Sequence, residues 1–235
     1  MNKIIVILIL YAAVGYSQGK NVRVAYGLII EKETGLFDNN AVLKNMLEKS
    51  ILESKKLTFQ LIITENGSKF YSEANLENDG TSGLKGFIHG MAHYAGTVYT
   101  LKEKLLFQKD LLGKNIYTQE DLKDNWLLTN ETKLIDNYLC YKATNSYTVI
   151  NGSKIFSYPV IAWYCPKLPF PHGPVGYGNL PGLILELRVR NTVYGAKNIE
   201  LNSDSNFDIK TLEKIKILNQ KQLEEAYDKL NGFIE

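Results

Sequence analysis

Histidine is the side chain best suited to proton transfer or metal binding near neutral pH, and the chain has three of them. His89 and His93 are four residues apart, a spacing that puts two imidazoles on one face of a helix. The zinc-protease version of this pair needs glutamate directly after the first histidine, where this chain has Gly90. Gly86 and Gly90 also disfavour a helix, so we expect both histidines in a loop or at the surface. Met91 between them leaves a soft transition-metal site as the alternative, but we predict no metal centre.

Three further residues have chemistry that could serve a site. His172 lies in a proline-rich stretch, where it could form a pH-sensitive contact. Cys165 would need a free thiol beside a base to act as a nucleophile, and its place in an alternating strand pattern disfavours that role. Glu186 stands between Leu185 and Leu187, so strand alternation could point it inward, although a solvated strand position is the simpler interpretation. The nucleophile-elbow, phosphate-loop, dinucleotide and C-x-x-C motifs are missing from the sequence, so we predict no catalytic residue and no cofactor.

The two cysteines lie on either side of a predicted hairpin. Asn151 and Gly152 form a typical two-residue turn, in which the numbers of paired residues would sum to 303. Cys165 would then be the diagonal neighbour of Cys140, and a loop longer by two residues would set the cysteines directly opposite each other. A disulfide is plausible in either register and would contribute roughly 3 kcal/mol. Two free buried thiols are the alternative.

The N-terminus has the parts of a cleavable secretion signal. Lys3 supplies a positive charge, residues 4–10 are an unbroken apolar run, and Gly15 and Ser17 are small residues suited to cleavage after position 17. The apolar run is too short to cross a bilayer, which takes about 20 residues. We therefore expect an exported protein of the periplasm or cell envelope, with residues 18–235 as one mature domain. A buried N-terminal strand is the alternative.

The elements expected downstream are mostly strands. Helical spacing occurs at residues 41–54, where Asn39 or Asn40 could cap the helix, and again at residues 220–230. The polar, glycine-bearing residues 73–86 are expected to be a mobile loop. Strand alternation is found at residues 21–32, 57–63, 94–108, 111–117, 126–129, 134–144, 155–164, 183–190, 198–202 and 214–218. Short connections between successive strands predict a mainly β domain built on one antiparallel sheet, open or partly closed.

Composition narrows the classes of partner. The formal net charge is only +2, with both signs interspersed, so the chain has no electrostatic footprint for nucleic acid. No stretch after the predicted leader approaches the length of a transmembrane helix. Fifteen tyrosines, many in alternating runs, favour strands over helices.

Residues 166–178 are expected to form an irregular crossing between strands. The four prolines in this stretch cannot donate ladder hydrogen bonds. Glycines at 176, 178 and 182 allow backbone angles or close approaches that a side chain would block. Pro181 and Gly182 have the form of a tight turn that leads residues 183–185 into a buried strand. The crossing is thus expected to be a rigid structure packed on the sheet, with a ligand-contacting rim as the alternative role.

The chain resembles the GLPGLI family, exported proteins of Bacteroidetes without a settled biochemical role. The resemblance rests on WLLTNETK at 126–133, YLCYKAT at 138–144, AWYCPKLP at 162–169, and GNLPGLIL at 178–185, where Asn179 replaces the usual glycine. A weaker match at residues 57–70 and 98–117 extends it over most of the mature chain. The resemblance implies a curved sheet, a half-barrel around a helix, similar to bacterial carriers of lipoproteins and other lipidic groups.

These observations favour a non-enzymatic envelope protein that binds a hydrophobic ligand or a lipidated partner in the concavity of its sheet. The residues predicted to form the rim are Trp163, Tyr164, His172, Tyr177 and Leu180. One alternative is an assembly subunit of an outer-membrane receptor or transport system, recognised through residues 166–181. A second alternative is a hydrolase with an unrecognised site that draws on His89, His93, His172 and Glu186.

Overall fold

The structure, a computed structural model, describes residues 21–73, 82–102, 104–111, 114–213, 215–219, 221–223 and 225. The predicted leader at residues 1–17 lies outside the described residues, as does most of the predicted helix at 220–230. The described strands form one open sheet in the order β12-β6-β5-β4-β3-β2-β1-β11-β10-β9-β8-β7. All neighbours are antiparallel except β12 and β6, so the predicted β-rich antiparallel sheet is confirmed. The strands are β1 Asn21–Ile30, β2 Thr58–Thr64, β3 Gly67–Ser72, β4 Thr97–Thr100, β5 Leu105–Leu111, β6 Lys114–Glu120, β7 Leu127–Ile135, β8 Tyr138–Asn151, β9 Lys154–Cys165, β10 Leu183–Val189, β11 Thr192–Ser203 and β12 Ile217–Leu218.

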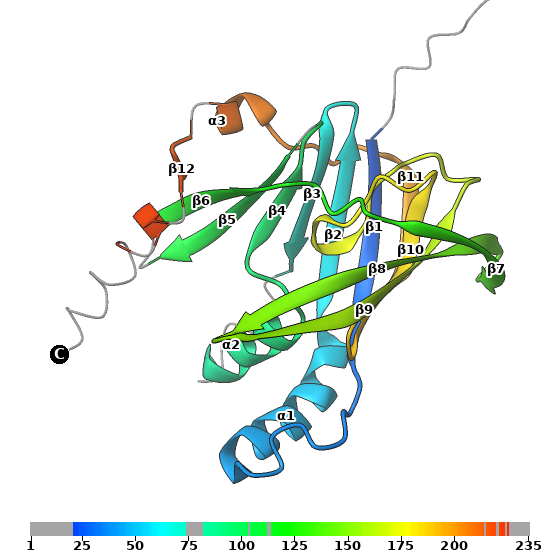
Figure 1. Cartoon of the computed structure of the whole chain (residues 1–235). Coiled ribbons are helices and arrows are strands. Elements are labelled where there is room, and N and C mark those ends of the chain that lie inside the picture. Colours follow the sequence, from blue (N-terminus) through cyan, green and yellow to red (C-terminus); the bar gives the residue numbers. More distant parts are fainter. Residues whose placement is uncertain are drawn as a thin grey trace, which may run out of the picture.

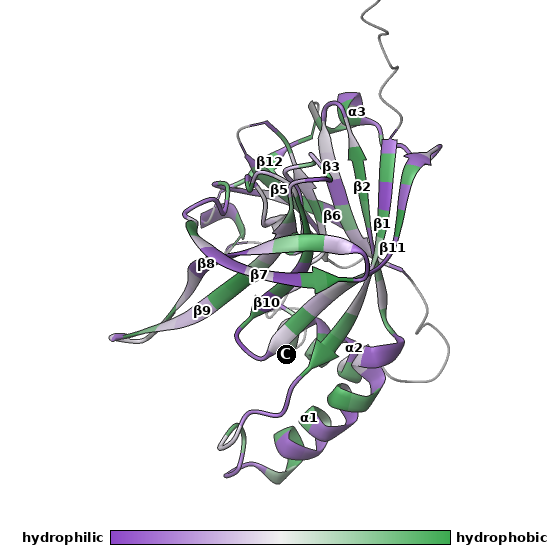
Figure 2. Ribbon diagram, turned by 90° about the vertical axis from the view of Figure 1, so that its right-hand side faces the viewer, coloured by the Kyte–Doolittle hydropathy of each residue, from purple (hydrophilic) through white to green (hydrophobic). Residues whose placement is uncertain are grey.

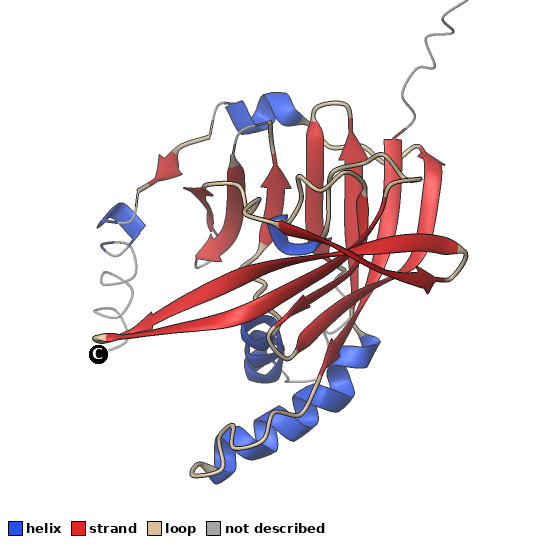
Figure 3. Cartoon of the chain, turned by 45° about the vertical axis from the view of Figure 1, so that its right-hand side comes forward, coloured by secondary structure: helices blue, strands red, loops and turns tan. Residues whose placement is uncertain are grey.

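The sheet is strongly curled, as the predicted half-barrel requires. The long β8–β9 hairpin crosses in front of the strands of the other half of the sheet (Figure 1), and the same crossing is visible after a 45° turn (Figure 3). Two helices lie toward one end of the strands and a third lies at the opposite end. The helices are α1 Ala41–Glu53, α2 Ser82–Met91 and α3 Ile209–Glu213, and the 3-10 turns are η1 Ser54–Lys56 and η2 Pro174–Gly176. No helix in the described ranges has the length and apolarity needed to cross a membrane.

Strand alternation decides which side chains face the inside of the curl. In β1, Val22, Val24 and Tyr26 are buried, whereas Arg23 between them is exposed. Figure 2 shows the matching alternation of hydrophobic and hydrophilic residues along this part of the sheet. Side chains on the inner face pack into one core, whose aromatic centre stacks Phe59 on Phe70 with ring centroids 5.4 Å apart. In a smaller cluster, Leu212 of α3 packs with Tyr99 and Leu106 of the sheet.

Helix α1 follows the prediction closely. Asn40 is its N-cap, and the side-chain oxygen of Asn40 accepts hydrogen bonds from the backbone N–H groups of Val42 and Leu43. Ser50 and Leu47 are buried on one face, which places the helix against the end of the sheet. The local signals, a capping side chain followed by apolar residues at helical spacing, were therefore sufficient here.

Helix α2 corrects the sequence analysis, which placed its first half in a mobile loop and rejected a helix at His89. The helix contains Gly83, Gly86 and Gly90, each of which costs about 1 kcal/mol relative to alanine. Ile88 is fully buried in the core, and neighbouring apolar side chains of the helix pack against that core. Burial of this face offsets the low helix propensity of the glycines, so the glycines do not exclude a helix here.

Several strand boundaries also differ from prediction, among them that of the strand predicted at 134–144, which is divided between β7 and β8. Residues 94–108 form two strands instead of one, because the chain reverses between β4 and β5, where the N–H of Leu101 donates to the carbonyl of Lys104 at 2.9 Å. The strand predicted at 214–218 is shortened to β12, after the unexpected helix α3. The error at residues 94–108 comes from apolar alternation that continues through a turn, which periodicity alone does not detect.

Candidate functional site

The crossing between β9 and β10 packs on the inner face of the sheet, as predicted. At its centre η2 is fully buried, and Val175 has φ 47°, an unusual value for a β-branched residue. Gly176 has φ 80°, and a Cβ built there would lie 2.9 Å from the Cδ1 of Leu105 in β5. The turn therefore packs closely on the sheet, and its positive φ favours glycine at this position. Strain of this kind persists only where the surrounding packing enforces it.

A second segment, residues 121–126 between β6 and β7, holds the crossing in place. Lys123 pairs with Tyr177 in an isolated parallel bridge. The indole N–H of Trp126 donates to the carbonyl of Gly178 at 2.8 Å, and the Trp126 ring lies 5.8 Å from that of Tyr177. Because these contacts join residues about fifty positions apart, the two segments are fixed to each other by tertiary structure alone.

A cavity of about 350 Å³ lies between this crossing, the C-terminal end of α2, strands β5 and β6, and the β8–β9 hairpin. Its volume is at the small end of the range found for ligand sites. Apolar and aromatic groups form most of the wall, and two histidines, a glutamate (Glu120) and a lysine supply the titratable groups. The residues that decide its chemistry are His89, His93, Phe107, Lys123, Tyr147 and Tyr177.

Both histidines line this cavity, and His89 is on α2 instead of in the predicted loop, which corrects the sequence analysis. His89 is on α2, and its ring packs edge-on against Tyr94 with centroids 4.8 Å apart. His93 has φ 54° just beyond the helix and packs edge-on against Tyr147, also at 4.8 Å. His89 is therefore on a helix and His93 is in the turn after it, so the shared helix face that the spacing suggested does not form.

Both imidazoles are neutral at physiological pH. Burial lowers the pKa of His89 to about 4, helped by the charge of Lys85. Burial likewise lowers the pKa of His93 to about 4, with smaller contributions from Arg190 and Lys123. The buried Nε2 of His89 has no hydrogen-bond partner among the described residues. Within these residues no group of three or more histidine, cysteine or acidic side chains could hold a metal ion.

Lys123 is one of the cavity residues that sequence reasoning missed, with Phe107, Glu120 and Tyr147. Its ammonium lies 5.0 Å from the ring centroid of Tyr177 and 5.3 Å from that of Phe107. It donates one hydrogen bond, to the carbonyl of Val175 at 3.3 Å. Burial lowers its pKa, and the charge of Glu120 partly opposes this effect. One lysine among many gives no signal in sequence, because its burial depends on a segment fifty residues away.

The five predicted rim residues do not form one surface. Tyr177 lines the cavity. Leu180 is only 2% exposed in the core, and His172 has a buried Nδ1 without a hydrogen-bond partner among the described residues. Trp163 and Tyr164 are consecutive in β9 and thus point to opposite faces of the sheet, so they cannot share a site. Of these five residues, only Tyr177 is among the described residues that line the cavity.

The residues considered for hydrolysis are also separated. The carboxylate of Glu186 forms an ion pair with Lys133 at 2.7 Å, and the same ammonium lies 4.6 Å from the ring centroid of Trp163. Glu186 and His172 are not among the described residues that line the cavity holding His89 and His93. The four side chains therefore do not converge on one reacting centre in the described structure.

The cysteines are two buried free thiols in the structure. Paired residue numbers in β8 and β9 sum to 305, because the two-residue turn is at Gly152 and Ser153, one position later than predicted. The register is therefore the one expected to set the cysteines opposite each other, although the loop is not longer. The last pair of this ladder is Tyr141 and Tyr164, and the next pair in the same register would be Cys140 and Cys165. Burial, with a smaller contribution from Cys165, raises the pKa of the Cys140 thiol to about 12, which makes it unsuited to nucleophilic chemistry. The disulfide stays a prediction.

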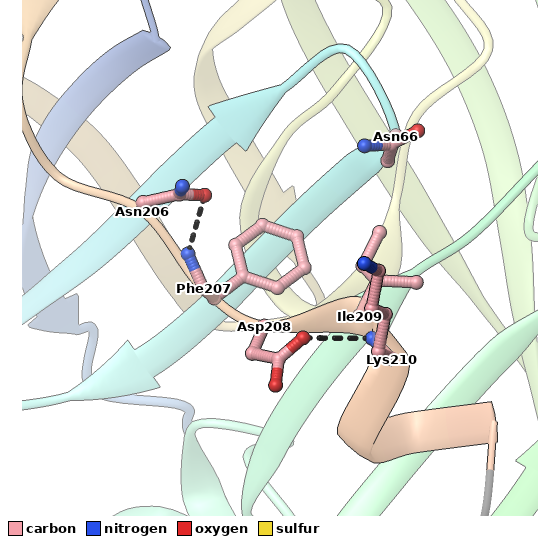
Figure 4. Close-up of a pocket in the computed structure, with 6 residues that line it drawn as sticks. All are labelled: Asn66, Asn206, Phe207, Asp208, Ile209 and Lys210. Carbon is pink, nitrogen blue, oxygen red and sulfur yellow. Dashed lines mark hydrogen bonds between the residues drawn. The ribbon is translucent and has the colours of Figure 1, made fainter.

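A larger hollow, of about 660 Å³, lies between the β2–β3 turn and residues 206–210. Figure 4 shows that two of its polar side chains, those of Asn206 and Asp208, bind the local backbone. Asn206 accepts from the N–H of Phe207, and Asp208 accepts from the N–H of Lys210, each at 2.8 Å. Because its walls come from two short surface segments whose polar groups stabilise turns, we consider the smaller inner cavity the better candidate site.

Comparisons with known proteins support the fold and give no function. The model of a family described as "Protein of unknown function (Porph_ging)" matches residues 153–186, which include the crossing. This match is consistent with the predicted family resemblance, whereas the GLPGLI name and the bacterial group stay predictions. No curated protein matches the chain.

Two solved structures of PNGF-II, in space groups C2 and P21, are similar to this chain. Their TM-scores are 0.53 and 0.52, each at 15% sequence identity over 88% of this chain. The match covers 32% and 33% of those structures, so the chain spans about a third of their length. At this level of identity the similarity shows a shared β-rich fold and nothing about activity.

Proposed function

We propose that this protein is a non-enzymatic, exported protein of the periplasm or cell envelope that binds a hydrophobic ligand, or the acyl group of a lipidated partner, in the cavity of its curled sheet. The observation that carries this proposal is the cavity itself. Its wall combines Phe107, Tyr147, Val175, Tyr177 and Val189 with a few polar groups. An apolar wall with few polar groups is the usual composition of a small-molecule site.

The rigidity of the wall supports the same conclusion. Tyr177 is hydrogen-bonded through its backbone N–H to Pro174 and packed against Trp126, so its ring has little freedom. A wall that is already ordered loses little entropy when a ligand binds. The cavity can therefore accept an apolar group without rearrangement of the crossing.

The observed arrangement of residues supports the two alternative functions less well than ligand binding. Recognition by an outer-membrane receptor through residues 166–181 would have to use exposed positions such as Lys167 and Asn179, because Tyr177 is 5% exposed and Leu180 is 2% exposed. A hydrolase needs its reacting groups together, and His172 and Glu186 are not among the described residues around His89 and His93. Neither alternative is carried by an observed arrangement of residues.

Uptake of 11-(dansylamino)undecanoic acid by delipidated protein, measured by fluorescence, tests the proposal. Ala95 is an exposed residue in the cavity wall, so Ala95→Trp should fill the cavity without disturbing the core. We expect this variant to weaken probe binding at least tenfold. Loss of the contacts of one well-buried apolar group costs about 1.5–3 kcal/mol, which corresponds to this factor or more.

Ala41→Trp is the matched control, because Ala41 is exposed at the start of α1 and does not line the cavity. The control should bind the probe as the unmodified protein does. Failure of the delipidated protein to take up the probe, or equal binding by both tryptophan variants, would count against the proposal.

A further inference from the structure

Lys123 is an incompletely partnered cation in the wall of the cavity. No carboxylate lies within ion-pair distance of its ammonium among the described residues. Its contacts are the faces of Phe107 and Tyr177 and one hydrogen bond to the carbonyl of Val175. An ammonium has three N–H donors, so this environment leaves donors unused. The side chain is half-buried, so its charge is only partly solvated, and a bound anion would compensate for the lost solvation.

The surroundings of Lys123 favour an anion over a cation. The charges of Arg190 and Lys123 both act on His93, and Lys85 acts on His89, so the potential at the two imidazoles is positive. The guanidinium of Arg190 is already bound to Glu33 at 2.7 Å. This leaves Lys123 as the cavity cation that is free to bind a ligand.

The acidic side chain that could serve as a counter-ion of Lys123 is Glu120, on β6. Glu120 lines the cavity, but its side chain is exposed and does not form an ion pair with Lys123 among the described residues. Its charge can lower the positive potential without filling the coordination of the ammonium. The acid therefore does not take the place of a bound anion.

The geometry points to Lys123 as the anchor for the anionic head of an amphiphilic ligand, whose apolar chain occupies the aromatic part of the cavity. This inference rests on the proposed function and names its ligand class, single-chain amphiphiles with a carboxylate or a similar anionic head. Val175 and Tyr177 hold the ammonium in position through the crossing.

Displacement of the neutral dye Nile red by three ligands with the same chain, decanoate, decan-1-ol and decylamine, separates the head group from the chain. We expect decanoate to displace the dye at a concentration at least tenfold lower than decan-1-ol, and decylamine to be the weakest. Lys123→Met should abolish the preference for decanoate while decan-1-ol binding persists, and Lys123→Arg should keep it. An effect of this size is typical of one partly buried charge pair.

Lys133→Met is the matched control. Lys133 is also a half-buried lysine above an aromatic ring, with its ammonium 4.6 Å from the ring centroid of Trp163, but it does not line the cavity. This variant should retain the preference for decanoate. Circular dichroism and thermal unfolding establish that each variant is folded before its binding is compared.

The outcomes distinguish this inference from the function on which it rests. If no ligand displaces Nile red, or the dye itself does not bind, the proposed function is wrong and this inference falls with it. If decanoate and decan-1-ol bind the unmodified protein equally, or decylamine binds best, only the inference is overturned. A preference for decanoate that survives in Lys123→Met also overturns it, and the ligand series alone decides the matter if that variant does not fold.

Discussion

At the scale of single residues, the buried histidines make stability depend on pH. Burial lowers the pKa of His172 to about 4, and those of His89 and His93 to similar values. An unfolded histidine has a pKa of about 6.5. Between about pH 4 and pH 6.5 the unfolded chain therefore binds more protons than the folded protein, and the free energy of unfolding rises with pH. The stability is complete above this window and is lost as the pH falls through it.

His172→Gln tests this linkage at one position. The side chain stays polar but no longer titrates, so the variant should lose less stability than the unmodified protein between pH 7.5 and pH 4.5. The expected difference is about 2–3 kcal/mol, from the lowered pKa of this one histidine. Urea unfolding at the two pH values measures it, and identical pH dependence of both proteins would contradict the prediction.

At the scale of elements, two glycine-containing segments show why sequence patterns predicted the crossing but not helix α2. The crossing was predicted to be rigid because prolines and glycines leave few backbone choices, and its turn at Gly182 has φ 154°. Helix α2 was missed because its glycines suggest a loop, and only burial of Ile88 against the sheet makes the helix stable. Glycine is required in the first segment and merely tolerated in the second.

Alanine at Gly182 and at Gly86 should have effects of opposite sign. A Cβ at Gly182 would lie 2.2 Å from the carbonyl oxygen of Cys165, so Gly182→Ala should destabilise the protein by at least about 2 kcal/mol. A Cβ at Gly86 meets nothing within 4 Å on the exposed side of α2, so Gly86→Ala should stabilise by up to about 1 kcal/mol. Chemical denaturation of both variants provides the comparison. A neutral Gly182→Ala would mean that the turn differs from the one described.

At the scale of the whole molecule, a few side chains fix the curl and with it the cavity. The hydroxyl of Tyr26 in β1 donates to the carbonyl of Ile184 in β10 at 2.6 Å. Tyr194 in β11 donates to the carbonyl of Ala92 at 2.8 Å, and Thr192 donates to the carbonyl of Met91, also at 2.8 Å. The last two bonds hold the end of α2, which carries the cavity histidines, against the sheet.

Tyr194→Phe should therefore affect stability and binding together. The buried carbonyl of Ala92 would lose its partner, at a cost of about 1–3 kcal/mol. Binding of the dansyl probe should weaken as well, because the end of α2 is less well positioned. Tyr71→Phe is the control, since the Tyr71 hydroxyl makes no hydrogen bond among the described residues. Unchanged unfolding and unchanged probe binding in Tyr194→Phe would show that α2 is positioned by other contacts.

The sequence by itself determined the local features of this protein. Alternation in β1, the Asn40 cap of α1 and the rigid crossing at 166–182 follow from interactions between residues close in the chain, and the structure has each of them. The predicted β-rich sheet follows from the sum of such signals.

Only the tertiary structure decided where the site is. The wall of the cavity depends on contacts such as that of Lys123 with Val175, which are 52 residues apart. It also depends on how far the sheet curls, because the curl brings Tyr147 of the hairpin to His93 beyond α2. Periodicity assigns a side chain to one face of its own element, but it cannot show which distant element covers that face. For this reason Tyr177 was predicted as a rim residue and lines the cavity, whereas Trp163, predicted to share its site, is not among the described residues that line it, and Lys123 was not predicted at all.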